Sequence, residues 1–159
     1  MLENKDYCDY ETSVALKKLG CSYLSNDKVY VGKGGLYCKC NPPYDSQKYN
    51  EGELLSQFYS LGCYKKVGTT IPAITLYDAQ KWLREEKEVY VTVIPEYNEF
   101  GPIKGVKYRL EVVHWKDDEF GYETIEWLDE ECPHTIITFD SYEEALSEGI
   151  KEAVKILKG

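Results

Sequence analysis

The chain has 159 residues, of which 43% are hydrophobic and 14% aromatic, and its formal net charge at pH 7 is −9. Such a chain can bury a core, so we expect one domain, residues 1–159, rather than a disordered protein. No run of 18 apolar residues exists, and the N-terminus lacks the basic region and apolar stretch of a signal peptide. We therefore expect a cytoplasmic protein with no membrane contact.

Charge is distributed unevenly along the chain. Residues 1–70 carry nine Lys against eight Asp and Glu, whereas residues 71–159 carry ten Lys and Arg against twenty Asp and Glu. A negative field repels phosphate groups, so the acidic C-terminal portion disfavours nucleic acid as a partner. The expected domain thus has a cysteine-rich helix and hairpin portion, 1–70, and an acidic portion, 71–159.

The first predicted helix covers residues 11–19. Thr12 or Ser13 can cap its N-terminus, because a hydroxyl oxygen accepts a hydrogen bond from an unpaired backbone N–H of the first turn. Gly20 follows the last apolar position and favours the left-handed conformation that ends a helix.

The next elements are predicted from a glycine-rich segment and a leucine stripe. The β-rich runs 28–31 and 36–40 flank Gly32–Gly35, a pattern typical of a hairpin. An open edge on this hairpin would allow a homodimer, so we expect a monomer or a homodimer. Residues 51–61 predict a helix capped by Asn50, because the apolar positions recur at helical spacing.

The C-terminal portion has clearer signals. A helix is predicted over 75–87, a strand over 89–94 and, after a turn at 101–105, another strand over 106–114. Alternation in this last strand places one set of side chains in the core and sends Lys107, Arg109 and Glu111 outward. The core set is Val106, Tyr108, Leu110, Val112 and His114.

Two further strands and a long helix complete the portion. Strands are predicted over 121–128 and 135–139, and Ser141 with Glu144 forms the capping box of the last helix. The apolar stripe of that helix is Tyr142, Leu146, Gly149, Ile150, Ala153 and Leu157. The predicted fold is α+β, an antiparallel sheet with helices packed on one face, and the C-terminal half has the order α-β-β-(β)-β-α.

Five segments carry a family resemblance: Ser13–Cys21, Pro72-Ala73, Leu76, Ala79–Glu85 and Tyr142–Leu146. Together with the valine-tyrosine strand between them, they resemble a family of small proteins from gut bacteria of the Bacteroidetes and from their phages and mobile elements. The resemblance spans residues 9–21 and 71–157. That family has no assigned activity, so the resemblance implies a cytosolic, phage-related accessory protein and assigns no catalytic residue.

The cysteines and glycines give no cofactor signature. A cytosolic chain keeps its six cysteines reduced, and Cys38-Lys39-Cys40 is a C-x-C pair rather than the C-x₂-C of a zinc knuckle. The segment Gly32–Gly35 lacks the spacing and the hydroxyl residue of a phosphate-binding loop. We therefore expect no metal and no cofactor.

Only two histidines are present. His114 falls on the apolar face of its strand, whereas His134 lies close to Cys132 and Glu131. A nucleophile and a base need a hydrogen-bonded geometry that adjacent residues do not produce by themselves. A small enzyme with a Cys/His/carboxylate site that the sequence does not reveal remains the alternative function.

Acidic residues dominate the segment 117–131, which contains eight Asp and Glu and no Lys or Arg. Three interpretations stay open: oxygen ligands for a divalent cation, a negative surface for a basic partner, or a solvated loop. Our functional hypothesis is a non-enzymatic interaction protein that binds a basic protein through an acidic aromatic surface. The candidate partner-binding residues are Asp117, Asp118, Glu119, Tyr122, Trp127, Asp129, Glu130 and Glu131.

Overall fold

The computed structural model describes residues 3–23, 28–40, 45–56, 63–98, 105–116, 121–132 and 135–159. The chain forms two compact units, an N-terminal unit of Tyr7–Thr75 and a C-terminal unit of Met1–Asp6 with Leu76–Gly159. Antiparallel sheets and helices make up both, which confirms the predicted α+β class. That the two units act as one domain stays a prediction. Of the helices in the described ranges, none has both the length and the apolar character needed to span a bilayer.

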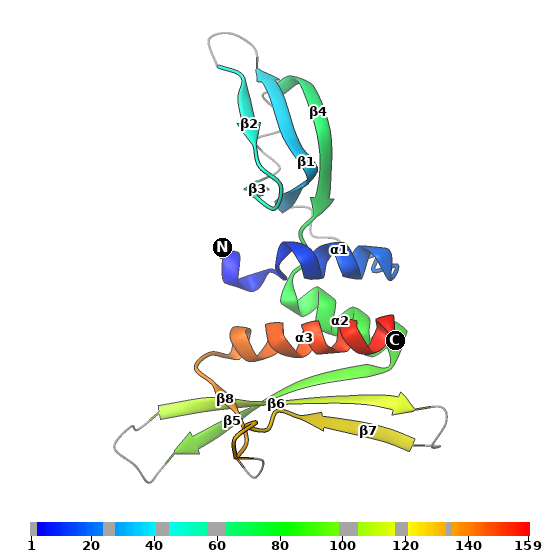
Figure 1. Ribbon diagram of the computed structural model, residues 1–159, viewed down its shortest axis with the longest axis vertical. Helices are drawn as coiled ribbons and strands as arrows, with labels where there is room; N and C mark the ends of the chain where they lie inside the picture. Colours follow the sequence, from blue (N-terminus) through cyan, green and yellow to red (C-terminus); the bar gives the residue numbers. More distant parts are fainter. Residues whose placement is uncertain are drawn as a thin grey trace. The chain divides into compact units, whose positions relative to one another are not determined.

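The C-terminal unit is an antiparallel sheet with β6 at its centre (Figure 1). Strand β5 pairs with one edge of β6, and β7 and β8 share the other edge. This order confirms the predicted α-β-β-β-β-α arrangement. The elements are η1 (Asn4–Asp6), α2 (Leu76–Lys87), β5 (Val89–Asn98), β6 (Gly105–Lys116), β7 (Gly121–Glu126), β8 (Thr138–Phe139) and α3 (Tyr142–Lys158).

Helix α3 begins as predicted, because the Ser141 hydroxyl accepts a hydrogen bond from the Glu144 backbone N–H at 3.1 Å. Its buried positions are Ala145, Leu146, Gly149, Ile150, Ala153 and Val154. The predicted ends of the stripe are wrong, since Tyr142 is exposed and Leu157 is only half-buried. An α-helix has 3.6 residues per turn, so a stripe of residues spaced three and four apart winds slowly around the helix. The residues at its two ends therefore turn away from the core.

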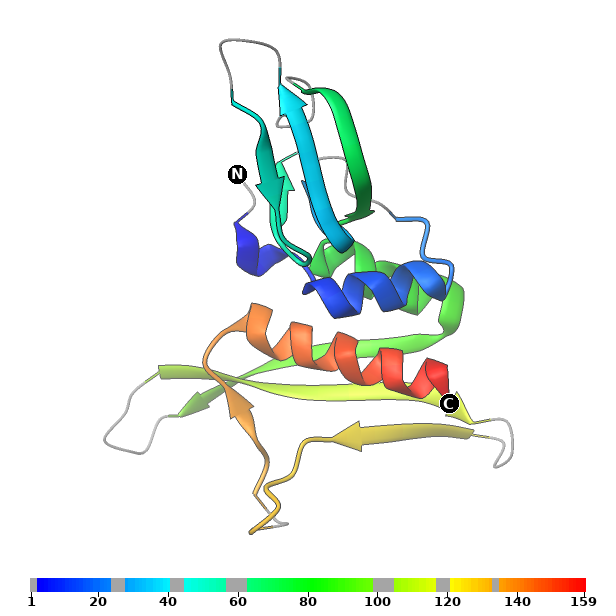
Figure 2. The same ribbon diagram turned by 45° about the horizontal axis from the view of Figure 1, so that its top comes forward.

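Helices α2 and α3 cover the same face of this sheet (Figures 1 and 2). Leu110 and Val112 of β6 are fully buried on that face. Gly149 lets α3 approach closely, because an added Cβ would lie 2.4 Å from Cγ1 of Val91 and 2.7 Å from Cδ1 of Leu110. The close contact between helix and sheet therefore requires the absence of a side chain at this position.

We expect Gly149→Ala to lower the free energy of unfolding by up to about 2 kcal/mol in urea titrations. The alanine gains about 1 kcal/mol in helix propensity, but overpacking a filled core costs about 1–3 kcal/mol and outweighs that gain. Gly105→Ala is the control, since an added Cβ there meets no heavy atom within 4 Å. Equal stability of the two variants would contradict the close packing of α3.

The N-terminal unit is built around one long strand, β1. Strand β4 pairs along one edge of β1, while β2 and β3 share the other edge. The elements are α1 (Tyr10–Lys18), β1 (Lys28–Cys40), β2 (Gln47–Tyr49), β3 (Leu54–Ser56) and β4 (Cys63–Pro72).

Helix α1 confirms the first predicted helix, but the predicted cap is wrong. The Asp9 carboxylate accepts a hydrogen bond from the Thr12 backbone N–H at 2.8 Å and caps the helix. Thr12 and Ser13 instead lie buried in the first turn. Gly20 has φ +90, as expected for a left-handed stop.

The predicted hairpin around Gly32–Gly35 is wrong, because β1 runs through this segment without reversing. Its pairing with β4 shifts register between Val31 and Leu36, which marks an irregularity instead of a turn. At Gly32 an added Cβ would lie 2.9 Å from the Thr69 carbonyl oxygen, so glycine permits close pairing of β1 with β4. Since β1 is paired on both edges, it offers no free edge for the dimer that the hairpin suggested.

The helix predicted over 51–61 is also wrong in its described part. Asn50 begins a turn, in which its backbone N–H donates to Oε2 of Glu53 at 2.7 Å, and the chain then enters β3. Pairing of β3 with Lys28–Tyr30 overrides the local helical spacing. Residues 57–61, like the predicted turn at 101–104, lie outside the described residues, and of the strand predicted over 135–139 only Thr138–Phe139 forms β8.

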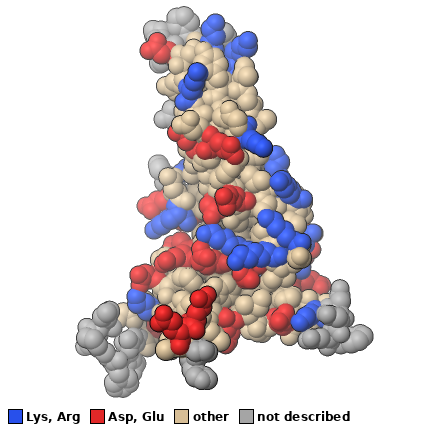
Figure 3. All heavy atoms as spheres, viewed as in Figure 1, with Lys and Arg blue, Asp and Glu red and all other residues tan. Residues whose placement is uncertain are grey.

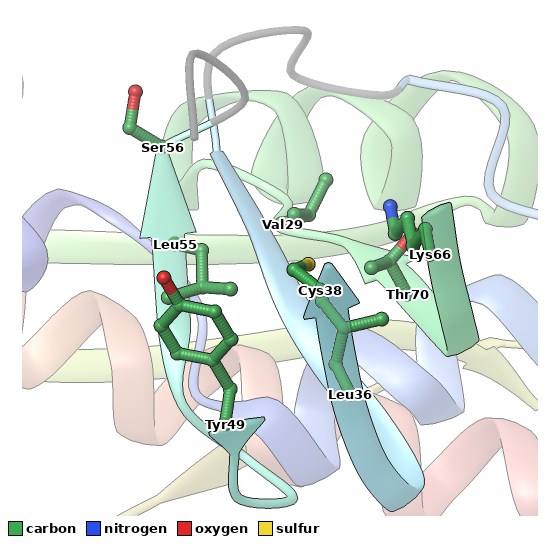
Figure 4. Close-up of a pocket in the computed structure, with 8 residues that line it drawn as sticks. All are labelled: Val29, Leu36, Cys38, Tyr49, Leu55, Ser56, Lys66 and Thr70. Carbon is green, nitrogen blue, oxygen red and sulfur yellow. The ribbon is translucent and has the colours of Figure 1, made fainter. Parts of the chain in front are cut away.

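Two apolar clusters stabilise this unit. In one, Leu36 and Cys38 pack with Tyr49 and Leu55 around a cavity of about 10 Å³, too small for a ligand (Figure 4). In the other, Tyr30 packs with the buried Tyr7 and Ala73 and with half-buried residues of α1, β3 and β4. The Tyr30 hydroxyl donates a hydrogen bond to the Cys8 carbonyl oxygen at 2.6 Å. Burial, aided by the nearby Cys8 and Asp9, raises the pKa of Tyr30 to about 12.

This raised pKa predicts alkaline destabilisation. The folded state favours neutral Tyr30, so its stabilisation is complete below pH ~10 and is lost as the pH rises through about 12. Between these values the free energy of unfolding should fall by about 1.4 kcal/mol per pH unit more steeply in the native protein than in Tyr30→Phe. Urea unfolding at several alkaline pH values measures the slope. An unchanged slope in Tyr30→Phe would refute the assignment.

Candidate functional site

One face of the β5–β6–β7 sheet has no described helix on it (Figures 1 and 2). Successive side chains of a strand point to opposite faces of the sheet. Because Leu110 and Val112 face α3, the alternate residues of β6, Arg109, Glu111 and Val113, face away from it. We call this surface the open sheet face. It is formed by Tyr90, Thr92, Ile94, Glu96, Lys107, Arg109, Glu111, Val113, Trp115, Tyr122, Thr124 and Glu126.

Aromatic side chains occupy one end of the open sheet face. Trp115 of β6 lies opposite Tyr122 of β7, and their rings pack edge to face with centroids 5.1 Å apart. The two residues are 41% and 59% exposed, and Tyr90 on β5 is 39% exposed. Val113 lies between Tyr90 and Thr124 in the strand register. Clustered exposed aromatic residues of this kind are typical of an interaction surface.

Carboxylates surround an arginine farther along the same face. Arg109 Nη1 lies 2.6 Å from Oε1 of Glu111 and 3.5 Å from Oε1 of Glu126. Its Nε is 3.2 Å from Oε1 of Glu96, but the angle is not that of a hydrogen bond. Glu111 and Glu126 are directly opposite each other, an arrangement that repels unless a cation intervenes. Arg109 supplies that cation and leaves two negative charges in excess among these four residues.

We expect Arg109→Gln to destabilise the C-terminal unit by about 1–3 kcal/mol, because three carboxylates lose their shared counter-charge. Added salt should restore part of the loss by screening the repulsion. Lys107→Gln is the control, since Lys107 is more exposed and, among the described residues, forms an ion pair with Asp140 only. Thermal melts at low and high salt compare the variants, and equal losses in both would contradict the shared role of Arg109.

His114 lies on the helix-covered face, half-buried, as predicted. Its Nε2 is 3.1 Å from Oε2 of Glu123, and its Nδ1 is 3.2 Å from the Trp115 carbonyl oxygen. Lys116 lies 3.8 Å from the same Glu123 oxygen. These contacts form a small polar network at the sheet edge.

The structure separates the predicted partner-binding residues. Tyr122 lies on the open sheet face, whereas Trp127 is half-buried and has the opposite strand parity. Asp129 accepts backbone hydrogen bonds from Glu131 and Cys132, both at 2.9 Å, so its carboxylate stabilises a turn. Glu130 and Glu131 are exposed. The other predicted residues, Asp117, Asp118 and Glu119, and also His134, lie outside the described residues.

The remaining candidate ligands do not assemble into a centre within the described ranges, where no group of three His, Cys, Asp or Glu residues could hold a metal ion. Cys8, Cys21 and Cys38 are buried, Cys40 is half-buried and Cys132 is exposed. Trp115 and Tyr90 are exposed surface residues that the sequence did not predict. The alternation that predicts an outward Arg109 also predicts an outward Trp115, because the two residues are six apart on the same strand.

Comparison with known proteins adds no relative: no family model, no curated protein and no solved structure matches this chain. The resemblance to a family of Bacteroidetes and their phages stays a prediction.

Proposed function

We propose that this protein is a non-enzymatic interaction protein that binds a basic protein partner through the open sheet face. One observation carries the proposal: Trp115 and Tyr122 pack together yet remain exposed, on a face that no described helix covers. Large, rigid aromatic side chains contribute binding energy at low entropic cost, and tryptophan and tyrosine are enriched among residues that dominate interfaces.

Charge supports a basic partner. The C-terminal unit carries eleven Lys and Arg against twenty-two Asp and Glu. On the open sheet face itself three carboxylates, Glu96, Glu111 and Glu126, outnumber the two cations, Lys107 and Arg109. A negative potential around an apolar anchor accelerates the approach of a positive partner and repels an acidic one.

A displayed library of random peptides tests this proposal with a defined probe. Selection on the immobilised protein should enrich peptides that combine Lys or Arg with apolar residues. Their affinity should fall about tenfold or more in Trp115→Ala and in Tyr122→Ala, because each variant removes an anchor. Raising the salt concentration should also weaken binding, since exposed charges become screened.

Tyr77→Ala is the matched control, because Tyr77 is 67% exposed but lies on α2. It should bind the selected peptides like the native protein. Enrichment of acidic peptides, or unchanged affinity in both open-face variants, would refute the proposed surface.

A further inference from the structure

The sheet of the N-terminal unit is uniformly basic. Its four strands contain no Asp or Glu, and Figure 3 shows several Lys side chains on the visible face of this sheet. The unit as a whole carries eight Lys against six Asp and Glu, so it differs in sign from the C-terminal unit. The strand lysines are Lys28, Lys33, Lys39, Lys48, Lys65 and Lys66.

Strand register gathers part of this charge around a tyrosine. Tyr37 on β1 lies opposite Lys48 of β2 on one side and Val67 of β4 on the other. Two residues along, Lys39 lies opposite Lys65. Residues in register or two apart share a face of a sheet, so these five side chains form one surface, which we call the basic face.

The basic face borders a shallow hollow of about 570 Å³, large enough for a small organic ligand. Tyr37, Lys48 and Val67 line it together with Lys33. The backbone of Gly34, Gly35 and Gly68 forms much of the remaining wall, which allows a ligand to approach the strands closely. The carboxylate of Glu51 also lines the hollow and accepts a hydrogen bond from the Tyr10 hydroxyl at 3.0 Å.

Three lysines that lie on the basic face or line the hollow have no counter-charge close to them among the described residues. In the part of the chain that the structure describes, no carboxylate lies within ion-pair distance of Lys33, Lys48 or Lys65. A bound polyanion would supply counter-charge to Lys48 and Lys65 and release counterions.

We propose that the basic face binds single-stranded nucleic acid, with backbone phosphates on Lys48 and Lys65 and a base stacked on Tyr37. Aromatic side chains between cations are the usual means of holding unpaired bases, because every base has a π-face. Val67, 53% exposed beside Tyr37, extends the apolar platform. An acidic protein would match the charge but would leave the aromatic and apolar centre without a partner.

The net charge of −9 does not override this local charge. At physiological salt the Debye length is about 8 Å, so charges farther away are largely screened and the nearest lysines dominate. The expectation that nucleic acid is excluded rests on the acidic C-terminal portion and does not apply to this sheet.

Fluorescence anisotropy of a labelled oligo(dT) of about 12 nucleotides, titrated with the full-length protein, tests the proposal. We expect saturable binding that weakens between about 50 and 200 mM salt. The double variant Lys48→Ala/Lys65→Ala should bind about tenfold more weakly and lower the slope of log K against log salt by about 1.4, as expected for two lost phosphate contacts.

Two comparisons distinguish binding at the basic face from nonspecific attraction by positive charge elsewhere on the protein. Lys17→Ala/Lys18→Ala makes the same charge change on exposed positions of α1 and should bind like the native protein. Tyr37→Leu should weaken binding about fivefold or more, whereas Tyr37→Phe should retain it, because only an aromatic ring stacks on a base. Both Tyr37 variants also keep the test valid if the double lysine variant does not fold.

Three results would overturn the proposal. The first is the absence of binding at low salt. The second is equal binding by the native protein and either the double lysine variant or Tyr37→Leu. The third is displacement of oligo(dT) by polyglutamate as effectively as by unlabelled oligo(dT), which would assign the face to acidic proteins.

Discussion

The C-terminal unit depends on side-chain alternation along β6, the strand that pairs with three others. Leu110 and Val112 are fully buried on the face that α3 covers, and Gly149 allows the helix to approach Leu110 closely. The same alternation forces Arg109 and Trp115 onto the opposite face. A slip of one residue would exchange the two faces, so core packing and the composition of the open sheet face are fixed by one register. The proposed binding surface is therefore a direct consequence of how the core is packed.

The sequence predicted the C-terminal unit well because its signals are local. The capping box of Ser141 and Glu144 and the period-two pattern of β6 involve residues close together in the chain. The N-terminal unit was misread where distant pairing decides the structure. Gly32–Gly35 has the composition of a turn, yet β4 pairs with both halves of β1 and keeps the chain extended. Leu54 and Leu55 fit a helical stripe, but they pair with Tyr30 and Val29 in a sheet.

The candidate site was predicted only in part, for a related reason. The sequence shows where carboxylates are dense, but it does not show which of them the fold already uses. Asp129 illustrates this, because its carboxylate accepts two backbone hydrogen bonds in a turn. In contrast, the pairing of Trp115 with Tyr122 depends on the register of β6 and β7, which only the structure provides. Of the eight predicted residues, Tyr122 is the one that the described structure places on the open sheet face.

Both proposed surfaces follow the same physical logic with opposite signs. Each has exposed aromatic or apolar side chains and, on the same face, charged side chains of one predominant sign, negative on the face of Trp115 and positive on the face of Tyr37. Apolar contact supplies affinity that salt screens little, whereas charge selects which class of partner approaches. A ligand attracted to one surface is repelled by the other, so the two surfaces would not compete for the same partner.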